Sequence, residues 1–193
     1  MFSLPDWAYY PFAALVTIGM VTAALSGRQS TYRSPEEIRA EGISVSGDEL
    51  AGIVLGNGLS AELLRDGEES FLRIGAARGP FDGIRSAGAF FRLSPSQTEA
   101  VQGHSVRITY TLRQADENGA EGVRLAFFVP GIGQSAWQRF EVGADYAPQS
   151  IEVTANSCDW THALMGMWPD WDGDATQIDV QSVTLELLEP LNC

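Results

Sequence analysis

The stretch HSVRITYTLR, residues 104–113, decides the fold class of the chain. Apolar and polar residues alternate along it, so an extended backbone has one apolar face and one polar face. The stretch GVRLAFFV, residues 122–129, follows the same rule. The residues between the two, QADENGAEG, are typical of a turn, which predicts a hairpin. The apolar residues expected to face a core are Val106, Ile108, Tyr110 and Leu112 in the first strand and Val123, Leu125, Phe127 and Val129 in the second.

Short alternating runs, bounded by glycine, proline, asparagine and aspartate, recur throughout residues 43–193. This spacing predicts an all-β domain, an antiparallel β-sandwich. The apolar phase of the last strand changes partway along it, which predicts a bulge near Gln181 or Ser182. The expected strands cover residues 51–55, 60–64, 70–76, 87–93, 105–113, 123–129, 137–142, 150–155 and 176–188.

The N-terminal segment predicts a membrane anchor. Residues 7–27 carry no charge, and about 20 apolar residues span a bilayer as a helix. We therefore expect residues 1–27 to form one transmembrane helix. The alternative is a signal peptide cleaved near Ala24 and Ser26. Within the helix, Gly19 and Ala23 form a small-xxx-small pair that would let another helix pack closely.

Residues 28–42 are polar and are predicted to form a tether to the sandwich domain, residues 43–193. A short helix over 35–40 is expected inside the tether, because Ser34 suits the N-cap and Pro35 the first helical position. The arginines after the anchor favour a cytoplasmic domain. A disulfide would favour the periplasm. The twelve basic residues are all arginine, which indicates a GC-rich bacterium as the source. We expect a single-pass protein of the bacterial inner membrane, with its domain in the periplasm.

The net charge and the cysteine content restrict the classes of partner and site that the chain can have. The formal net charge of −13 repels phosphate backbones, so nucleic acid is excluded as a partner. Neither of the two cysteines, Cys158 and Cys193, sits in a CxxC pair or near a histidine at metal-ligand spacing. We expect them to form a disulfide, and two buried free thiols are the alternative.

The order of five segments resembles the galactose-binding-like jelly rolls, a superfamily that includes many carbohydrate-binding modules. The segments are NGLSAELLRDGEESFLRIG (57–75), GHSVRITYTLRQ (103–114), VRLAFFVPGIGQSAWQRFEV (123–142), QSIEVTA (149–155) and TQIDVQSVTLELL (176–188). The resemblance covers residues 47–188 and implies a jelly-roll sandwich. Its members bind glycans, serve as interaction modules or act as accessory subunits, so the fold alone does not choose a function. It also implies that Asp179 lies where some relatives place a structural calcium ligand.

Residues 156–179 hold three tryptophans and five aspartates. Four of these aspartates could supply the carboxylate oxygens that calcium prefers, namely Asp170, Asp172, Asp174 and Asp179. An EF-hand, however, needs glycine where Ala175 stands and glutamate where Gln181 stands. A calcium site and a solvated acidic loop both stay open, and no other cofactor is expected.

The aromatic residues of the same segment allow three interpretations. They form a platform for sugar rings, a contact patch for another protein, or buried core. We expect a contact surface, because tryptophan and methionine are enriched at protein interfaces. Its members are Trp160, Met165, Met167, Trp168 and Trp171.

Catalytic motifs such as G-x-S-x-G and H-E-x-x-H do not occur, so we do not expect an enzyme. The sequence favours a non-catalytic, single-pass accessory subunit whose sandwich docks on a larger respiratory, photosynthetic or transport complex in the lipid bilayer. The alternative is a membrane-tethered module that binds a glycan or another ligand.

Overall fold

The structure is a computed structural model of two units, Met1–Tyr32 and Arg33–Cys193. In the second unit it describes residues 33–82, 86–131, 133–154, 158–171 and 173–191, without the side chains of residues 133 and 134. In the first unit it describes five residues, all with helical backbone: Tyr10, Ala14, Val16, Thr17 and Met20. The predicted anchor, residues 1–27, therefore lies almost wholly outside the described residues. Within the described part, no helix has the length and apolar character needed to cross a bilayer.

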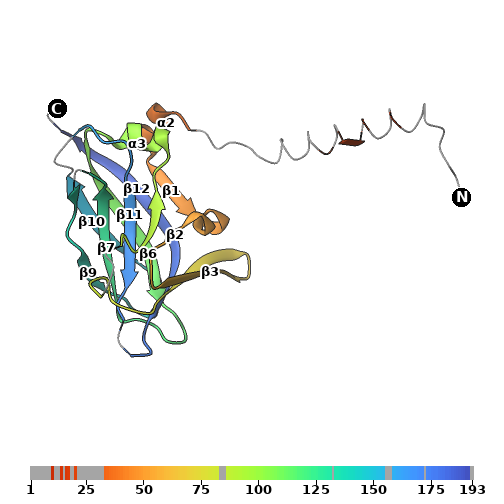
Figure 1. The fold of residues 1–193 in the computed structure, drawn as a ribbon, viewed down its shortest axis with the longest axis vertical. Helices are drawn as coiled ribbons and strands as arrows, with labels where there is room; N and C mark the ends of the chain where they lie inside the picture. The colour runs from red at the N-terminus through yellow and green to blue at the C-terminus, as the bar shows by residue number, and fades with distance from the viewer. Residues whose placement is uncertain are drawn as a thin grey trace, which may run out of the picture. The chain divides into compact units, whose positions relative to one another are not determined.

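The second unit is an antiparallel β-sandwich, which confirms the predicted all-β fold (Figure 1). Its described residues form two sheets of six strands each. Sheet A has the order β10-β6-β12-β4-β3, and β1 also pairs with β12. The bounds of its strands are Ile43–Ser46 (β1), Leu59–Asp66 (β3), Glu69–Ala76 (β4), His104–Gln114 (β6), Ala147–Thr154 (β10) and Gln177–Pro190 (β12).

Sheet B has the order β2-β5-β11-β7-β8, and β9 also pairs with β7. Its strands are Val54–Leu55 (β2), Ala89–Arg92 (β5), Gly122–Val129 (β7), Gly133–Gln134 (β8), Gln138–Glu141 (β9) and Leu164–Pro169 (β11). The core lies between the sheets, and all eight residues predicted to face it are buried. Tyr110 reaches across the core, where its hydroxyl donates to the carbonyl of Gly166 at 3.4 Å.

The predicted hairpin between residues 105–113 and 123–129 is wrong. β6 pairs with β10 and β12 in sheet A, whereas β7 lies in sheet B. The reason is burial on both faces of β7: Ala126 and Phe128 are buried on the face away from the core, in a second apolar cluster. A strand covered on both sides fits the interior of the second sheet better than a hairpin with one wet face.

The register confirms the predicted bulge, because the pairing of β12 with β6 shifts between Val180 and Ser182. Two other segments differ from the expectation. The sequence predicts a strand over residues 51–55, but Gly47–Gly52 form a 3₁₀ helix (η1) before the short β2. Residues 164–169, which carry no predicted strand, form β11 in the middle of sheet B.

Two short helices follow the same local rule. α2 (Pro35–Glu41) confirms the predicted helix, and α3 (Pro95–Val101) has the same start, a serine followed by proline with Glu or Gln three residues after the serine. Both have a complete capping box. Ile38 of α2 is buried in the core, so part of the segment predicted as a tether belongs to the sandwich unit.

Candidate functional site

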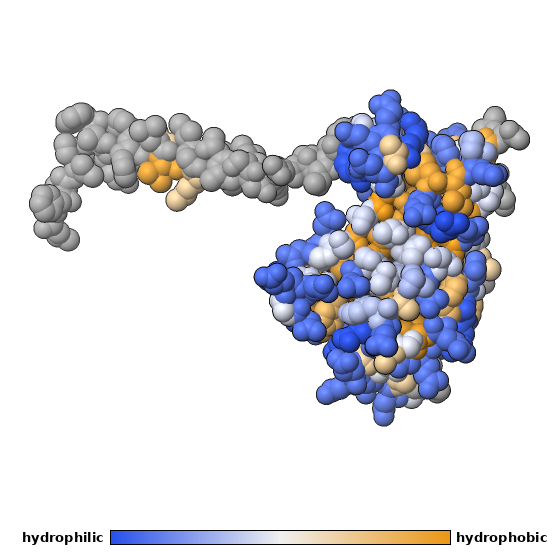
Figure 2. All heavy atoms as spheres, turned by 180° about the vertical axis from the view of Figure 1, so that it is seen from behind, coloured by the Kyte–Doolittle hydropathy of each residue, from blue (hydrophilic) through white to orange (hydrophobic). Residues whose placement is uncertain are grey.

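The structure corrects the predicted contact surface. Four of its members are buried in the sandwich unit, namely Trp160, Met165, Met167 and Trp168. Three of them lie on β11, which is flanked by β5 and β7 and packs side chains on both faces. Trp160, which precedes β11, packs edge-on against Phe127 in the core. Trp171, which follows β11, is 50% exposed. In the view of Figure 2, apolar residues on the described surface are interrupted by hydrophilic and weakly polar ones.

The structure also corrects the use of Asp179 as a calcium ligand. Asp179 is fully buried, and both of its carboxylate oxygens accept hydrogen bonds from Arg73, at 2.7 and 2.9 Å. Arg113 lies 3.4 Å away on the other side. Two arginines therefore neutralise this carboxylate, which is what a bound cation would otherwise do.

The other predicted calcium ligands do not gather. Asp170 is paired with arginines, Asp174 is exposed, and Asp172 lies outside the described residues. No group of three or more acidic, histidine or cysteine side chains in the described ranges could hold a metal ion.

Three further predicted residues, Gly19, Ala23 and Cys193, also lie outside the described residues. Cys158 takes part in a disulfide, and its pairing with Cys193 stays a prediction.

A row of three side chains crosses the outer face of sheet B. Arg124 of β7 stands opposite Trp168 of β11 on one side and opposite Arg139 of β9 on the other. Asp170 comes two residues after Trp168, and its backbone N–H donates to the carbonyl of Gly122 at 2.8 Å. The alternation of side chains in a strand therefore brings Asp170 to the same face as the two arginines.

This face is hollowed into a cleft with a volume of about 350 Å³. We call it the arginine cleft. It is lined by Gly79, Pro80, Glu121, Arg124, Arg139, Asp170, Trp171 and Ala175.

Asp170 fixes both arginines of the arginine cleft. The Nε of Arg124 donates to one of its carboxylate oxygens at 2.9 Å, and the Nε of Arg139 donates to the other. Like charges directly opposite each other on neighbouring strands repel, and the shared carboxylate offsets that repulsion. The hydrogen bond and charge of Asp170, together with the charges of Glu141 and Glu121, hold the pKa of the Arg139 guanidinium above its ordinary value.

Gly122 provides the room for this arrangement. A Cβ atom at this position would come within 2.6 Å of an Asp170 carboxylate oxygen and 2.7 Å of an Arg139 nitrogen. The carboxylate and the guanidinium thus occupy space that any other residue would fill.

Three aromatic side chains lie near the arginines of the cleft. Trp168, opposite Arg124 on the neighbouring strand, is fully buried, with its indole N–H donating to the carbonyl of Arg78 at 2.8 Å and its ring edge-on to Trp137. Trp171 lines the cleft itself, and Phe81, 73% exposed, lies with its ring centre 5.9 Å from the Arg124 guanidinium carbon. Trp168 is buried, whereas the exposed rings of Trp171 and Phe81 can meet a ligand.

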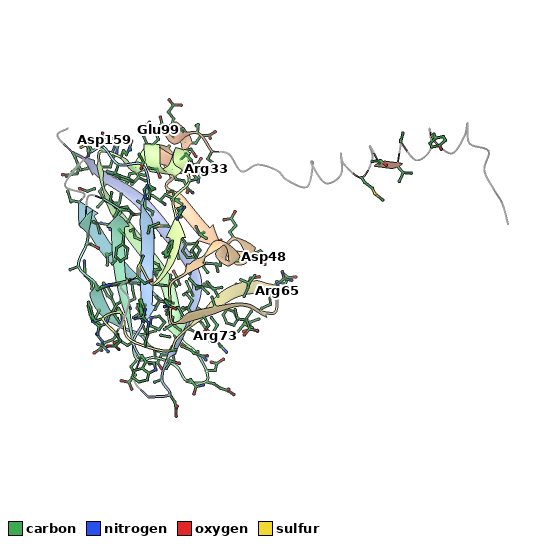
Figure 3. The ribbon with its side chains drawn as sticks, in the orientation of Figure 1. Arg33, Asp48, Arg65, Arg73, Glu99 and Asp159 are labelled. Carbon is green, nitrogen blue, oxygen red and sulfur yellow. The ribbon has the colours of Figure 1, made fainter. Side chains whose placement is uncertain are left out.

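A second hollow, of about 610 Å³, lies beside the β3–β4 hairpin. Arg65 and Ser70 both donate to the Asp48 carboxylate there, and Figure 3 shows Asp48 and Arg65 near each other. Exposed aromatic rings do not occur among its described lining residues, whereas half-exposed Trp171 lines the arginine cleft. The arginine cleft is therefore the better candidate site.

The chemistry available in the arginine cleft is recognition of a polar ligand. Its arginines are donors with a fixed direction, and Trp171 offers a flat apolar surface. Both oxygens of Asp170 accept hydrogen bonds from arginines, so the role of this carboxylate in the cleft is to hold the two guanidinium groups in place. Sequence reasoning missed the two arginines, which lie on the polar phase of their strands like many solvated residues.

Comparison with known proteins finds likeness in structure. No family model and no curated protein matches the sequence. The CBM22-1 xylan-binding domain from Paenibacillus barcinonensis is 14% identical, with a TM-score of 0.46, covering 76% of this chain and 94% of that one. A carbohydrate-binding module of a Cellvibrio mixtus lichenase, in complex with cellotriose, is 13% identical, with a TM-score of 0.40 and coverages of 76% and 98%.

A larger protein matches over part of its length. The CBM22-1 and GH10 modules of a Clostridium thermocellum endo-1,4-beta-D-xylanase, complexed with xylohexaose, are 11% identical with a TM-score of 0.48. The match covers 72% of this chain and 27% of that one, so the chain spans about a quarter of its length. The resemblance to carbohydrate-binding β-sandwich modules that the sequence pattern indicates is thus found among solved structures. A likeness at this level concerns the fold, and the function has to be argued from the cleft.

Proposed function

We propose that this protein is a non-catalytic glycan-binding module with a jelly-roll sandwich, and that the arginine cleft is its binding site. The observation that carries the proposal is the combination of half-exposed Trp171 with two arginines held on one carboxylate. A pyranose ring has an apolar face that packs on an aromatic ring, and a rim of hydroxyl groups that accept hydrogen bonds. In the cleft, Trp171 can pack against the apolar face, and the two arginines can donate hydrogen bonds to the hydroxyl groups.

The pairing of the arginines makes binding less costly. Immobilising a free arginine side chain on a ligand costs about 0.5–1.5 kcal/mol in lost rotamer freedom. Here Asp170 already holds Arg124 and Arg139 before any ligand arrives. The site is therefore organised in advance, which raises affinity without adding contacts.

The proposal keeps residues 1–27 as a predicted membrane anchor. The uncharged run over residues 7–27 has the length of a bilayer span. A module held at a membrane would meet glycans near that surface at a high effective concentration, so modest intrinsic affinity would suffice. An accessory-subunit role is a second proposal. It requires a different contact surface, because four of the five residues predicted to form that surface are buried.

The test is binding of the full chain, in mild detergent, to an array of plant and bacterial polysaccharides. We expect retention on at least one polysaccharide, with affinity reduced at least about tenfold by Trp171→Ala. Leu55→Ala is the matched control, because Leu55 is also an exposed apolar side chain, 40% accessible, and does not line the cleft; it lies on β2, which β5 and β11 separate from β7 in sheet B. Absence of binding to every polysaccharide, or equal loss in both variants, would contradict the proposal.

Gly122→Ala provides a second variant that removes no side-chain contact. Its Cβ would displace Asp170 and Arg139 from their present positions, so binding should weaken while the sandwich stays folded. Gly143→Ala is its control, since no atom lies within 4 Å of the added Cβ at that position.

A further inference from the structure

The two arginines of the cleft use little of their hydrogen-bonding capacity. Each guanidinium carries five N–H donors. Arg124 and Arg139 each spend their Nε–H on Asp170, and in the described part of the chain neither makes another hydrogen bond or ion pair. Their terminal nitrogens are therefore available to a ligand, and these side chains are only partly buried.

The arginine pair carries one positive charge more than the carboxylate that holds it, while Glu121 brings the formal charge of the cleft lining to zero. Asp170 is a single carboxylate serving two guanidinium groups. Glu121 also lines the cleft; it is exposed, forms no hydrogen bond or ion pair with either arginine among the described residues, and acts on Arg139 through its charge. Glu141 acts on Arg139 only through its charge. A neutral sugar needs no such pair of donors, whereas a carboxylate matches planar guanidinium groups and binds them with charge-assisted hydrogen bonds.

We infer that the arginine cleft selects acidic glycans, with a uronic-acid carboxylate between the terminal nitrogens of Arg124 and Arg139 and the sugar ring against Trp171. The inference rests on the proposed glycan-binding function and names its ligand class. Glu121 then serves as an acceptor for a sugar hydroxyl at the rim of the cleft.

The overall charge of −13 does not prevent this selection. At physiological ionic strength the screening length is about 8 Å, so charges elsewhere on the domain act weakly on a ligand inside the cleft. A carboxylate in contact with two guanidinium groups is screened much less. Binding of the acidic glycan should nevertheless weaken as salt is raised, while binding of a neutral glycan should change little.

The experiment compares each acidic polysaccharide with its own carboxyl-reduced form, which keeps the backbone and removes the charge. Polygalacturonate, alginate and glucuronoxylan are the probes, measured by calorimetry with the full chain in mild detergent. We expect at least one acidic polymer to bind about tenfold or more tightly than its reduced form.

Arg139→Gln should bring that ratio close to one, because glutamine keeps a hydrogen-bond donor but loses the charge. Arg107→Gln is the matched control: Arg107 has a side-chain exposure of 41% against 43% for Arg139, and it lies on sheet A, paired with Glu152. Circular dichroism confirms that each variant is folded.

The outcomes separate this inference from the function on which it rests. A wild-type ratio near one with clear binding of the neutral polymers would overturn the acidic selectivity and leave glycan binding intact. A high ratio that survives Arg139→Gln would overturn the assignment to this arginine pair. Failure of every polymer to bind, acidic or neutral, would remove the proposed function itself.

Discussion

The replacement Asp179→Asn tests how the sandwich holds a buried charge. Asp179 lies on β12, directly opposite Arg73 of β4 and Arg113 of β6. It accepts two hydrogen bonds from Arg73 and lies 3.4 Å from Arg113, whose guanidinium also stacks on the Tyr146 ring at 4.8 Å. Asparagine has nearly the same shape, so the change removes the charge and leaves the packing.

The expected loss follows from the burial of the three groups. Breaking a buried ion pair by removing one partner costs about 3–5 kcal/mol, because the remaining charge is left without compensation. Here the side chains of Arg73 and Arg113 are 23% and 21% exposed, so water offsets part of that cost. We expect a loss of about 3 kcal/mol in the free energy of unfolding, which lowers Tm by roughly 6–12 °C in a domain of this size.

The assay is urea unfolding followed by circular dichroism, with Asp48→Asn as the control. Asp48 pairs with Arg65 on the surface, where both side chains are about two thirds exposed (67% and 65%), so its replacement should leave stability almost unchanged. A loss below about 1 kcal/mol for Asp179→Asn would refute the reasoning. So would a rise in the Tm of the wild-type domain on adding calcium that disappears in Asp179→Asn, since that result would make Asp179 a metal ligand.

Three further predictions concern other parts of the sandwich unit. Tyr110→Phe should reduce the free energy of unfolding by about 0.5–1 kcal/mol, since its buried hydroxyl makes one long hydrogen bond, and chemical denaturation showing a gain in stability would contradict this. Burial raises the pKa of this hydroxyl, so absorbance titration should show Tyr110 protonated until the protein unfolds. The backbone N–H of Ser34 donates to the Glu37 carboxylate and lowers its pKa below the ordinary value of 4.5. The contribution of Glu37 to the stability of α2 is therefore complete above pH 4.5 and is lost as the pH falls through the lower, folded-state pKa. An NMR titration that gives Glu37 a pKa of 4.5 or above would disprove this prediction.

Local patterns in the sequence predict the strands well but not their partners. The alternation in residues 104–113 identifies the core face of β6, because side-chain direction in a strand depends only on local geometry. The same pattern cannot tell which strand lies alongside, and the turn residues after β6 join two sheets rather than a hairpin. The start of α3 repeats the capping motif that predicts α2, so that helix was within reach of sequence reasoning.

The candidate site was harder to predict than the fold. β11 is continuous in apolar residues because it is covered on both faces, and such a run lacks the alternation that marks a half-exposed strand. Arg124, Arg139 and Asp170 lie on three different strands or their ends, and only the register brings them together. Gly122 is a usable local signal, since a glycine inside a strand often marks a close approach of other groups.

The proposal that the arginine cleft binds a glycan is tested most directly by an NMR titration. The full chain, in detergent, is titrated with a polysaccharide that it binds on the array. The indole N–H signal of Trp171, assigned through Trp171→Phe, should shift on binding because this ring lines the cleft. The indole of Trp160, which is buried in the core between the sheets, should not shift. Arg124 and Arg139 side-chain signals should move with Trp171 at the same ligand concentration. Saturable binding that leaves Trp171 and both arginines unperturbed would contradict the account, because the ligand would then be held elsewhere on the molecule.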